Sequence, residues 1–320
     1  MFNPIKALAR KVVEYSTTRR ATLGLYQWLF ECSPHRLADI LVRLQKRPDF
    51  DFDWTVRLLN GKTIVVPVSK DNPGSWEFAH AYHWHDVGLR NVERLIHGFF
   101  GDDGIFFDVG ANMGVRSLLP LSEGRKCVLF EPNPRLRCFT ERVLERNRLS
   151  PYEVHNICLS NVVGTQSFFL TESSYTSSLH RENAAAFGPV EEVAVPTTTL
   201  DAWCESHPEL PHPSVIKIDV EGADYEVLVG AERVIKAAHP VILIELAWTP
   251  AERQRSFDLL ADHGYSAFGI LNTSRLKLVQ LSRDSQSCYA ASNNYVFVND
   301  ESLVEQLKRY CGTARHGHVS

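Results

Sequence analysis

The sequence predicts an α/β fold built on a mostly parallel sheet, preceded by a helical cap and a short β-hairpin. From about residue 90, apolar runs alternate with glycine or polar breaks and amphipathic stretches, which is typical of strands and helices around a parallel sheet. Upstream, apolar residues recur at three-to-four spacing over residues 4–46. Between these regions, Asn60-Gly61 separates two β-like runs and favours a tight hairpin turn.

Composition bounds the class of protein. A chain of 320 residues with 44% hydrophobic and 22% charged residues is ordinary for a globular protein. With 34 basic and 38 acidic residues the net charge is −4, so we expect no nucleic-acid partner. Seven cysteines without a CxxC pair disfavour zinc and redox motifs and fit a reduced, cytoplasmic setting. No run of 18 apolar residues predicts a membrane span, and the N-terminal residues do not resemble a secretory signal.

The first elements are helical. Ser33-Pro34 interrupts the periodic stretch and predicts a helix start. Such a cap can shape a substrate pocket or merely pack and form a homo-oligomer, and the sequence leaves both open. Further on, His80, His83 and His85 have a spacing that places only the first two on one helical face, so we expect surface or pocket-lining histidines rather than a metal cluster.

The main sheet follows. We expect sheet strands at residues 105–109, 126–130, 152–158, 215–220, 240–247 and 294–298, and β-rich segments at 265–270 and 276–281. Helices are expected near residues 134–147, 225–238 and 250–264. No repeat or low-complexity segment interrupts this order.

Residues 105–114 carry the strongest single signal. A bulky apolar strand ends at Asp108 and is followed by Gly110, Ala111 and Gly114, so the chain can turn tightly and approach a ligand closely. At the carboxyl edge of a parallel sheet, such a loop lies where ligands bind. Asp108 can hold the cation of an amino-acid group, directly or through water. A dinucleotide site is the alternative, but its glycines are spaced GxGxxG and an acid here would repel phosphate.

The next two strands add candidate cofactor ligands. Glu131 ends the second strand about 20 residues after the loop, where a carboxylate can accept both hydroxyls of a ribose. It could instead be an acid favoured by the helix that begins near Pro134. After the third strand, Ser160 and Asn161 are candidates to bond an adenine ring, although an ordinary polar turn explains them as well.

Taken together, the motifs FFDVGANMG, FEPNP, LSNVVGTQSFFL, VPTTTLDAW, IKIDVEGADYEVLVGAERVI and PVILIEL, in this order, resemble the FkbM-type family of S-adenosylmethionine-dependent methyltransferases. The likeness covers roughly residues 100–247. It implies a class I methyltransferase (Rossmann-like) fold, with a seven-stranded sheet whose last strand is antiparallel. It also implies O-methylation of a hydroxyl on a sugar, glycan or polyketide-like metabolite, with S-adenosyl-L-methionine as the cofactor.

The resemblance also assigns site residues, and the pattern along the chain predicts the domain boundaries. Asp108, Gly110, Asn112 and Gly114 match the first cofactor motif of the family, and Glu131 matches its ribose-binding acid. Asn161 stands where an aspartate is usual, and Asp224 where glutamate is commoner. The chain then divides into a helical cap (1–50), a hairpin and connecting segment (51–89), an S-adenosylmethionine-binding methyltransferase domain (90–300) and a C-terminal tail (301–320).

The candidate chemical centre lies on the fourth strand. Alternation along a strand would place Lys217, Asp219 and Glu221 on one face, and three charges there need partners or a polar cleft. Either carboxylate could be the base that takes the proton of a substrate hydroxyl, with Lys217 holding the other charge or the substrate. A purely architectural network of ion pairs is the alternative.

A divalent metal site and two alternative functions are also considered. Asp219 and Glu245 could hold a divalent metal ion, but two carboxylates without a third fixed ligand disfavour this, so no metal site is assigned. The functional alternatives are a methyltransferase-like scaffold without turnover and, less favoured, an NAD-dependent oxidoreductase. The acceptor, a small molecule or glycan, is not identified by any motif.

Overall fold

The computed structural model describes residues 4–84, 86–99, 104–171, 176–246, 249–282 and 292–311. The chain divides into two units, one formed by residues 1–87 with 142–148 and the other by residues 88–141 with 149–320. The first unit thus contains the predicted cap, the predicted hairpin and most of the connecting segment.

Three helices open the first unit: α1 (Pro4–Thr17), α2 (Arg20–Cys32) and α3 (His35–Leu44), each in contact with the other two. The predicted helices in residues 4–46 are confirmed, and α3 begins directly after Pro34. The predicted hairpin is also confirmed, because β1 (Phe52–Arg57) and β2 (Thr63–Val68) pair antiparallel around a turn in which Gly61 has a φ of +84°.

The histidine stretch lies on α4 (Pro73–Trp84) and corrects one expectation. His80 is buried rather than on the surface or in a pocket, with its ring packed against Trp54, Trp76 and Phe30 at centroid distances of 4.7, 4.3 and 4.8 Å. Burial lowers the pKa of His80 to about 4, so its ring is neutral at physiological pH. His83 is half-buried, and His85 lies outside the described residues.

The second unit contains an eight-stranded sheet in the order β12-β11-β13-β10-β9-β3-β4-β5. Its strands are β3 (Phe106–Val109), β4 (Cys127–Phe130), β5 (Tyr152–His155), β9 (Val215–Ile218), β10 (Val241–Glu245), β11 (Ser266–Ile270), β12 (Leu278–Leu281) and β13 (Asn294–Val298). The predicted count of seven is therefore wrong for the described residues, because β12 pairs antiparallel with β11 and adds an edge strand.

The order of the other seven strands is that of a class I methyltransferase sheet. From β10 through β9, β3 and β4 to β5 all pairs are parallel, whereas β13 is antiparallel to both β10 and β11. The predicted antiparallel last strand is thus confirmed. After β3 the chain adds β4 and β5 on one side of β3, and it later adds β9 on the other side. The end of β3 is therefore a topological switch point of the sheet.

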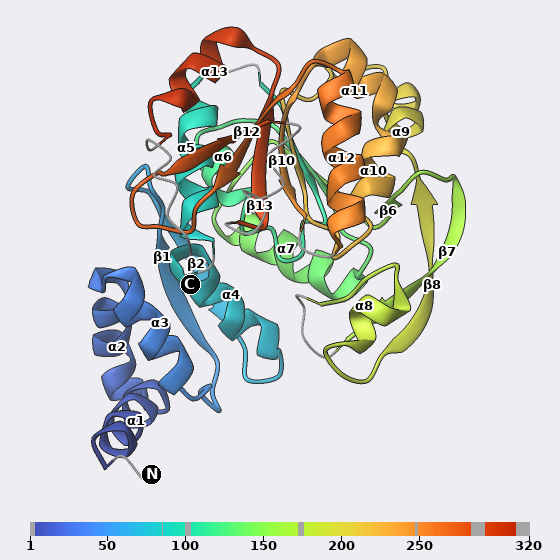
Figure 1. Ribbon diagram of the computed structural model, residues 1–320. Helices are drawn as coiled ribbons and strands as arrows, with labels where there is room; N and C mark the ends of the chain where they lie inside the picture. The colour runs from blue at the N-terminus through green and yellow to red at the C-terminus, as the bar shows by residue number, and fades with distance from the viewer. Residues whose placement is uncertain are drawn as a thin grey trace. The chain divides into compact units, whose positions relative to one another are not determined.

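Helices cover both faces of this sheet (Figure 1). On one face, α9 (Leu200–Ser206), α10 (Asp224–Gly230), α11 (Glu232–Ala238) and α12 (Pro250–Asp262) share a core with alternate residues of the strands, among them Phe107, Ile216 and Ile242. On the other face lie α5 (Val87–Phe99) and α13 (Glu301–Lys308), and the ring of His97 on α5 packs edge-on against Phe106. The short helix α6 (Leu118–Ser122) follows β3, and the longer α7 (Pro134–Arg146) follows β4.

Several predicted boundaries need correction. Residues 152–158 do not form one strand, because β5 ends at His155 and Cys158 belongs to β6 (Cys158–Leu159) of a separate three-stranded sheet with β7 (Gly164–Leu170) and β8 (Glu191–Thr198). The helix expected at residues 225–238 is broken at Ala231 into α10 and α11. The segment expected as a tail contains α13, which packs against β12 and β13.

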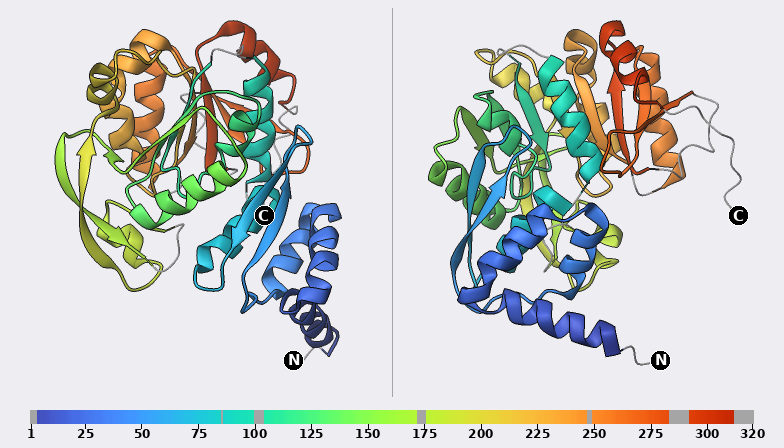
Figure 2. Two further views of the ribbon diagram at one scale, coloured as in Figure 1. Left: turned by 180° about the vertical axis from the view of Figure 1, so that it is seen from behind. Right: turned by 90° about the vertical axis from the view of Figure 1, so that its left-hand side faces the viewer.

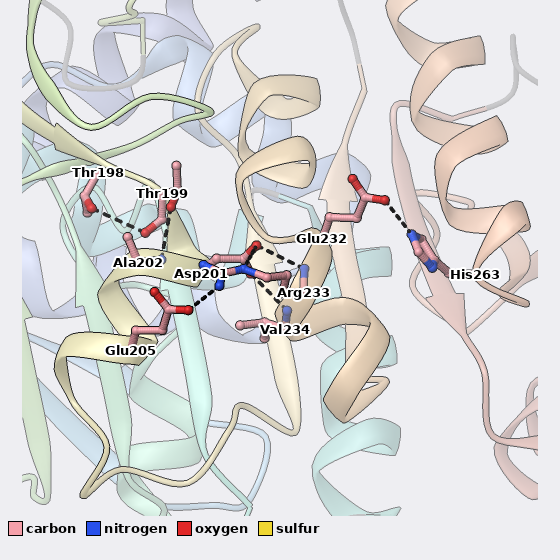
Figure 3. Close-up of polar contacts among 9 residues, drawn as sticks. All are labelled: Thr198, Thr199, Asp201, Ala202, Glu205, Glu232, Arg233, Val234 and His263. Atoms are coloured by element: carbon pink, nitrogen blue, oxygen red, sulfur yellow. Dashed lines mark hydrogen bonds and ion pairs between the residues drawn. The ribbon is translucent and has the colours of Figure 1, made fainter.

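The break before α11 is stabilised from another helix (Figure 3). Asp201 on α9 accepts hydrogen bonds from the backbone N–H groups of Arg233 and Val234, at 3.0 and 2.9 Å. Since Ala231 offers no side-chain cap, Asp201 supplies the acceptor that the first turn of α11 lacks. None of the helices in the described ranges has the length and apolar character needed to cross a membrane.

Candidate active site

The loop after β3 is held against the ends of both neighbouring strands. The backbone N–H groups of Gly110 and Ala111 donate to the carbonyl oxygen of Phe130, at the end of β4, over 3.1 and 3.0 Å. Gly110 has a φ of +71°, and a Cβ there would lie 1.9 Å from the carbonyl oxygen of Asp219, just after β9. Only glycine therefore fits where these three segments meet.

Two more residues of this loop have special backbone geometry. Asn112 has a φ of +52°, which asparagine tolerates better than most residues, and its N–H donates to Glu131 Oε2 over 2.8 Å. Gly114 has a φ of +76°, and a Cβ there would lie 2.7 Å from Thr140 Cγ2 on α7. The loop is thus fixed by main-chain contacts, and Ala111 within it is buried.

Glu131 joins the loop after β3 to the segment before α7. Its two carboxylate oxygens accept from the N–H groups of Asn112 and Asn133, each at 2.8 Å. Burial raises the pKa of the Glu131 carboxyl to about 7, although those two donors lower it. Asn156 holds the same segment from the other side by donating to the carbonyl oxygens of Glu131 and Pro132.

A buried lysine connects the loop with the end of β9. Lys217 Nζ lies 2.8 Å from the carbonyl oxygen of Gly110, 3.2 Å from Asp219 Oδ2 and 3.5 Å from Asp108 Oδ1. Burial lowers the pKa of Lys217, but the carboxylates of Asp219 and Asp108 outweigh it and raise that pKa well above its usual range. The lysine is therefore a permanent cation between two acids.

Exposure separates the members of this cluster. The side chains of Asp108 and Lys217 are 0% and 5% exposed, whereas that of Asp219 is 33% exposed. Ser117 donates to Asp108 Oδ2 over 2.8 Å, so Asp108 is held from two sides. Of the three, Asp219 is the one that reaches the surface of the site.

Glu221 does not share a strand face with Lys217 as expected. β9 ends at Ile218, so Asp219 and Glu221 lie beyond it, and Glu221 adopts a left-handed conformation with a φ of +55°. The alternation argument therefore fails for Glu221. Its carbonyl oxygen instead accepts from Ser178 Oγ at 2.7 Å and Asn183 Nδ2 at 3.2 Å, which ties the segment at residues 176–183 to the turn after β9.

Asp224 organises that same turn. Its two carboxylate oxygens accept from the N–H groups of Val220 and Gly222, each at 3.1 Å. Burial, followed by the charge of Asp219, raises the pKa of Asp224 to about 7 against the effect of these donors. A small hollow beside it is lined by Gly222, Asp224, Tyr225, Leu246, Thr249, Glu252 and Arg253.

Ser160 and Asn161 lie elsewhere than predicted. They follow β6 in the three-stranded sheet, not a strand of the main sheet. Ser160 is buried, with its N–H donating to Thr198, and its carbonyl oxygen is so close to α10 that a Cβ on Gly230 would lie 2.0 Å away. Asn161 is exposed. Ser160 therefore packs closely against α10.

Sequence reasoning missed three members of the site. Ser117, which holds Asp108, lies directly before α6, and no helix was predicted from the sequence at that position. Asn183 has no sequence signal that singles it out. Arg116 lies 3.7 Å from the buried Glu93 of α5. No sequence motif predicts this ion pair, because its two partners lie in segments that are distant in the sequence.

The metal hypothesis gains no support from geometry. In the part of the chain that is described, no group of three or more histidine, cysteine, aspartate or glutamate side chains is arranged to hold a metal ion. Glu245 ends β10, on the far side of β9 from β3.

Comparison with known proteins gives a family and a relative. The model of the methyltransferase FkbM domain matches residues 108–267, which is half of the chain. Over 158 residues the chain is 30% identical to the hexuronic acid methyltransferase AglP of Haloferax volcanii. That match covers 49% of this chain and spans 62% of the length of the relative.

Two of the solved structures that match this chain share little sequence with it. Methyltransferase FkbM from Methylobacillus flagellatus has 17% identity and a TM-score of 0.40, over 62% of this chain and 44% of that one. A putative transferase from Pyrococcus horikoshii has 12% identity and a TM-score of 0.39, over 92% of this chain and 97% of that one.

Proposed function

Because the chain belongs to the FkbM methyltransferase family, we propose that it is an S-adenosylmethionine-dependent O-methyltransferase that acts on a hydroxyl of a sugar, glycan or polyketide-like metabolite. Support for a sugar acceptor comes from the relative named as a hexuronic acid methyltransferase. The methyl donor and the acceptor are both parts of this proposal.

One observation carries the proposal. The glycine loop, Glu131 and Asp219 follow β3, β4 and β9, and these strands are neighbours at the switch point of the sheet. In open α/β sheets, ligands bind in the crevice at this point. Main-chain contacts between Gly110, Phe130 and Asp219 bring the three segments together.

The residues at this edge fit a sulfonium nucleoside. Each oxygen of Glu131 accepts one N–H, and a carboxylate has about four lone-pair positions, so acceptor capacity remains for ribose hydroxyls. Carboxylates at the site suit a cofactor with a positive charge and disfavour a pyrophosphate. We propose that Asp108, Gly110, Ala111, Asn112, Gly114 and Glu131 form the cofactor site, with Ser160 and Asn161 at its border.

In the proposed mechanism, S-adenosylmethionine supplies a methyl group on a positively charged sulfur. Asp219 then accepts the proton of the acceptor hydroxyl, because it is the partly exposed acid of the buried cluster. Lys217 acts as a positioning residue: its ammonium group fixes Asp219 and the Gly110 carbonyl while remaining out of reach of an acceptor. Glu221 is the second candidate base, and its position in the turn that Ser178 hydrogen-bonds suits contact with the acceptor.

The cofactor part is tested by calorimetric titration of the full chain with S-adenosylhomocysteine and with NADH. We expect binding of the thioether and none of NADH. Binding of NADH alone would overturn the proposal in favour of an oxidoreductase.

The catalytic part is tested with Asp219→Asn. Transfer of labelled methyl groups from S-adenosylmethionine to a panel of uronic acids, neutral sugars and hydroxylated metabolites is measured. We expect kcat to fall by about 10² or more, the usual contribution of a positioned base, with the thioether still bound. Asp71→Asn, on an exposed aspartate of the other unit, is the control and should keep full activity. Wild-type turnover by Asp219→Asn would remove Asp219 from the mechanism.

A further inference from the structure

The helices of the first unit expose apolar side chains in an ordered pattern. On α1, Leu8, Val12 and Tyr15 are all exposed, and their spacing of four and three residues places them on one face. An apolar stripe at this spacing normally faces a protein core. Here it faces outward.

Helix α2 is apolar on two opposite faces. Leu23, Tyr26 and Phe30 are buried, and the rings of Tyr26 and Phe30 pack with Trp54 of the hairpin. About half a turn around the helix, Leu25, Trp28 and Leu29 are exposed, with Trp28 at 60%. The helix is therefore anchored by one face, and the second face is available for a partner.

Helix α3 repeats the pattern with Leu37 and Ile40 exposed. These eight side chains account for two thirds of the exposed large hydrophobic residues among the described part of the chain. The three helices that carry them contact one another and lie together in both views of Figure 2. We call these eight residues the apolar faces of α1 to α3.

Charge distinguishes the same segment from the rest of the chain. Residues 1–47 contain nine lysines and arginines but three aspartates and glutamates, a net charge of +6. Because the whole chain carries −4, residues 48–320 carry −10. Some of the cations adjoin the apolar faces: Lys11 precedes Val12 and is exposed, and the guanidinium of Arg19 lies 4.4 Å from the centroid of the Tyr15 ring.

A second copy of the chain is a poor occupant for this surface. Joining two copies through α1 to α3 would bring two segments of charge +6 together, and like charges across an interface oppose association. An anionic lipid surface meets both properties, because acyl chains accept the apolar side chains and headgroups attract the cations. Trp28 suits the same boundary, since tryptophan favours the interface between headgroups and acyl chains.

We infer that α1 to α3 dock the protein on an anionic membrane surface through the apolar faces and the surrounding lysines and arginines. The helices lie on the lipid and do not cross it. This inference is independent of the proposed methyl transfer, because it uses no residue of the candidate active site.

The test is flotation of the full chain with phosphatidylcholine vesicles, with and without about 30% phosphatidylglycerol. We expect binding to the anionic vesicles to exceed binding to neutral ones by about tenfold at about 0.1 M salt, and to fall steeply at about 0.5 M. Absence of binding to either vesicle, or equal binding to both, would overturn the inference.

Two sets of variants separate the contribution of the apolar side chains to vesicle binding from that of the cationic side chains. Val12→Gln with Leu25→Gln and Trp28→Gln should lower vesicle binding about tenfold or more, because each removes apolar area from the contact. Lys11→Gln with Lys46→Gln and Arg47→Gln should lower binding to anionic vesicles alone. The matched control is Val163→Gln with Phe187→Gln, two exposed apolar residues of the other unit, which should leave binding unchanged.

Folding and self-association are measured on the same samples. Circular dichroism and thermal unfolding should match the wild type for every variant, since the altered side chains are exposed. Light scattering should report a monomer without vesicles. A dimer that the Val12, Leu25 and Trp28 variant dissociates, with no vesicle binding by the wild type, would show that a second copy occupies this surface instead.

Discussion

Gly110 is required by its surroundings more than by its own backbone angle. Gly110→Ala would place a methyl group 1.9 Å from the Asp219 carbonyl oxygen, so the loop or the end of β9 must move. We expect a loss of about 3 kcal/mol in unfolding free energy, together with loss of S-adenosylhomocysteine binding.

Gly124 provides the control for this prediction. It also has a positive φ, +86°, but nothing lies within 4 Å of a Cβ placed there. Gly124→Ala should therefore cost only the backbone strain, about 1 kcal/mol. Chemical denaturation of both variants measures the difference, and equal losses would contradict the explanation by close approach.

Lys217 neutralises an acid that has no access to water. Lys217→Met would leave Asp108 buried beside an apolar side chain, and breaking such a pair from one side costs about 3 kcal/mol. Adding Asp108→Asn should recover part of that loss, because no charge then remains unpaired. Lys236→Met, on an exposed residue of α11, should change stability by less than about 0.5 kcal/mol in the same urea titrations. Strictly additive losses would rule out the pairing.

Asp224 makes stability depend on pH in a definite direction. Burial and the charge of Asp219 raise its folded-state pKa from 3.8 to about 7, so the native state holds a proton that the unfolded chain has released. The stabilisation from this proton is complete below about pH 4 and is lost as pH rises through about 7. Denaturation at a series of pH values should show stability falling over this window, and less steeply for Asp224→Asn. An unchanged slope in the variant would contradict the assignment.

Residue chemistry explains which parts of the site the sequence could predict. The glycine loop is local, since an apolar strand, an acid and two glycines occur within ten residues. The ion pair of Lys217 with Asp108 is not local, because it depends on the register in which Asp108 lies opposite Lys217 in β3 and β9. Asn183 donates to a main-chain oxygen, and no side-chain motif in the sequence predicts such a contact.

At the scale of elements, α11 depends on a cap from another helix. Asp201 accepts from two N–H groups in its first turn and lies 3.3 Å from the side chain of Arg233 (Figure 3). Asp201→Asn keeps one acceptor oxygen at most, so we expect a loss of about 1–2 kcal/mol, the usual value for a helix cap.

Glu205 supplies a matched comparison because it pairs with the same arginine. Its side chain is exposed, and an exposed ion pair contributes little. Glu205→Gln should therefore change the unfolding free energy by less than about 0.5 kcal/mol. Thermal unfolding of the two variants side by side measures this, and similar losses would show that the ion pair, not the cap, stabilises α11.

Element boundaries were the least predictable feature of the fold. Apolar periodicity runs through residues 225–238, so the sequence favours one helix there. The break follows Gly230, which contacts the backbone of Ser160 from another sheet. Similarly, β5 ends early because Asn156 turns away to bind the backbone of Glu131 and Pro132. Both causes are long-range contacts that periodicity does not contain.

At the scale of the whole molecule, strand order was predicted better than strand number. The family motifs imply the arrangement around β3, and the structure has it, with β13 antiparallel between β10 and β11. The eighth strand, β12, comes from a segment that was expected to be β-rich but had no assigned place.

Ligand binding should stabilise the fold if the switch point of the sheet is the cofactor site. At a concentration of one hundred times its dissociation constant, S-adenosylhomocysteine should add about 2.7 kcal/mol to the unfolding free energy. The measurement is the shift in melting temperature, and Gly110→Ala should show none. A shift of equal size in Gly110→Ala would place the ligand elsewhere.

Strand β12 lies at the edge of the main sheet, where another copy of the chain could pair with it. An outer strand displays unpaired main-chain groups to which another chain can add, and proteins commonly block such a template. Here the N–H of Leu278 donates to the carbonyl oxygen of Tyr310, and Leu278 forms a bridge with Cys311. Residues 309–311 therefore cover the edge of β12 at Leu278, where a strand of another copy would otherwise have main-chain groups to pair with.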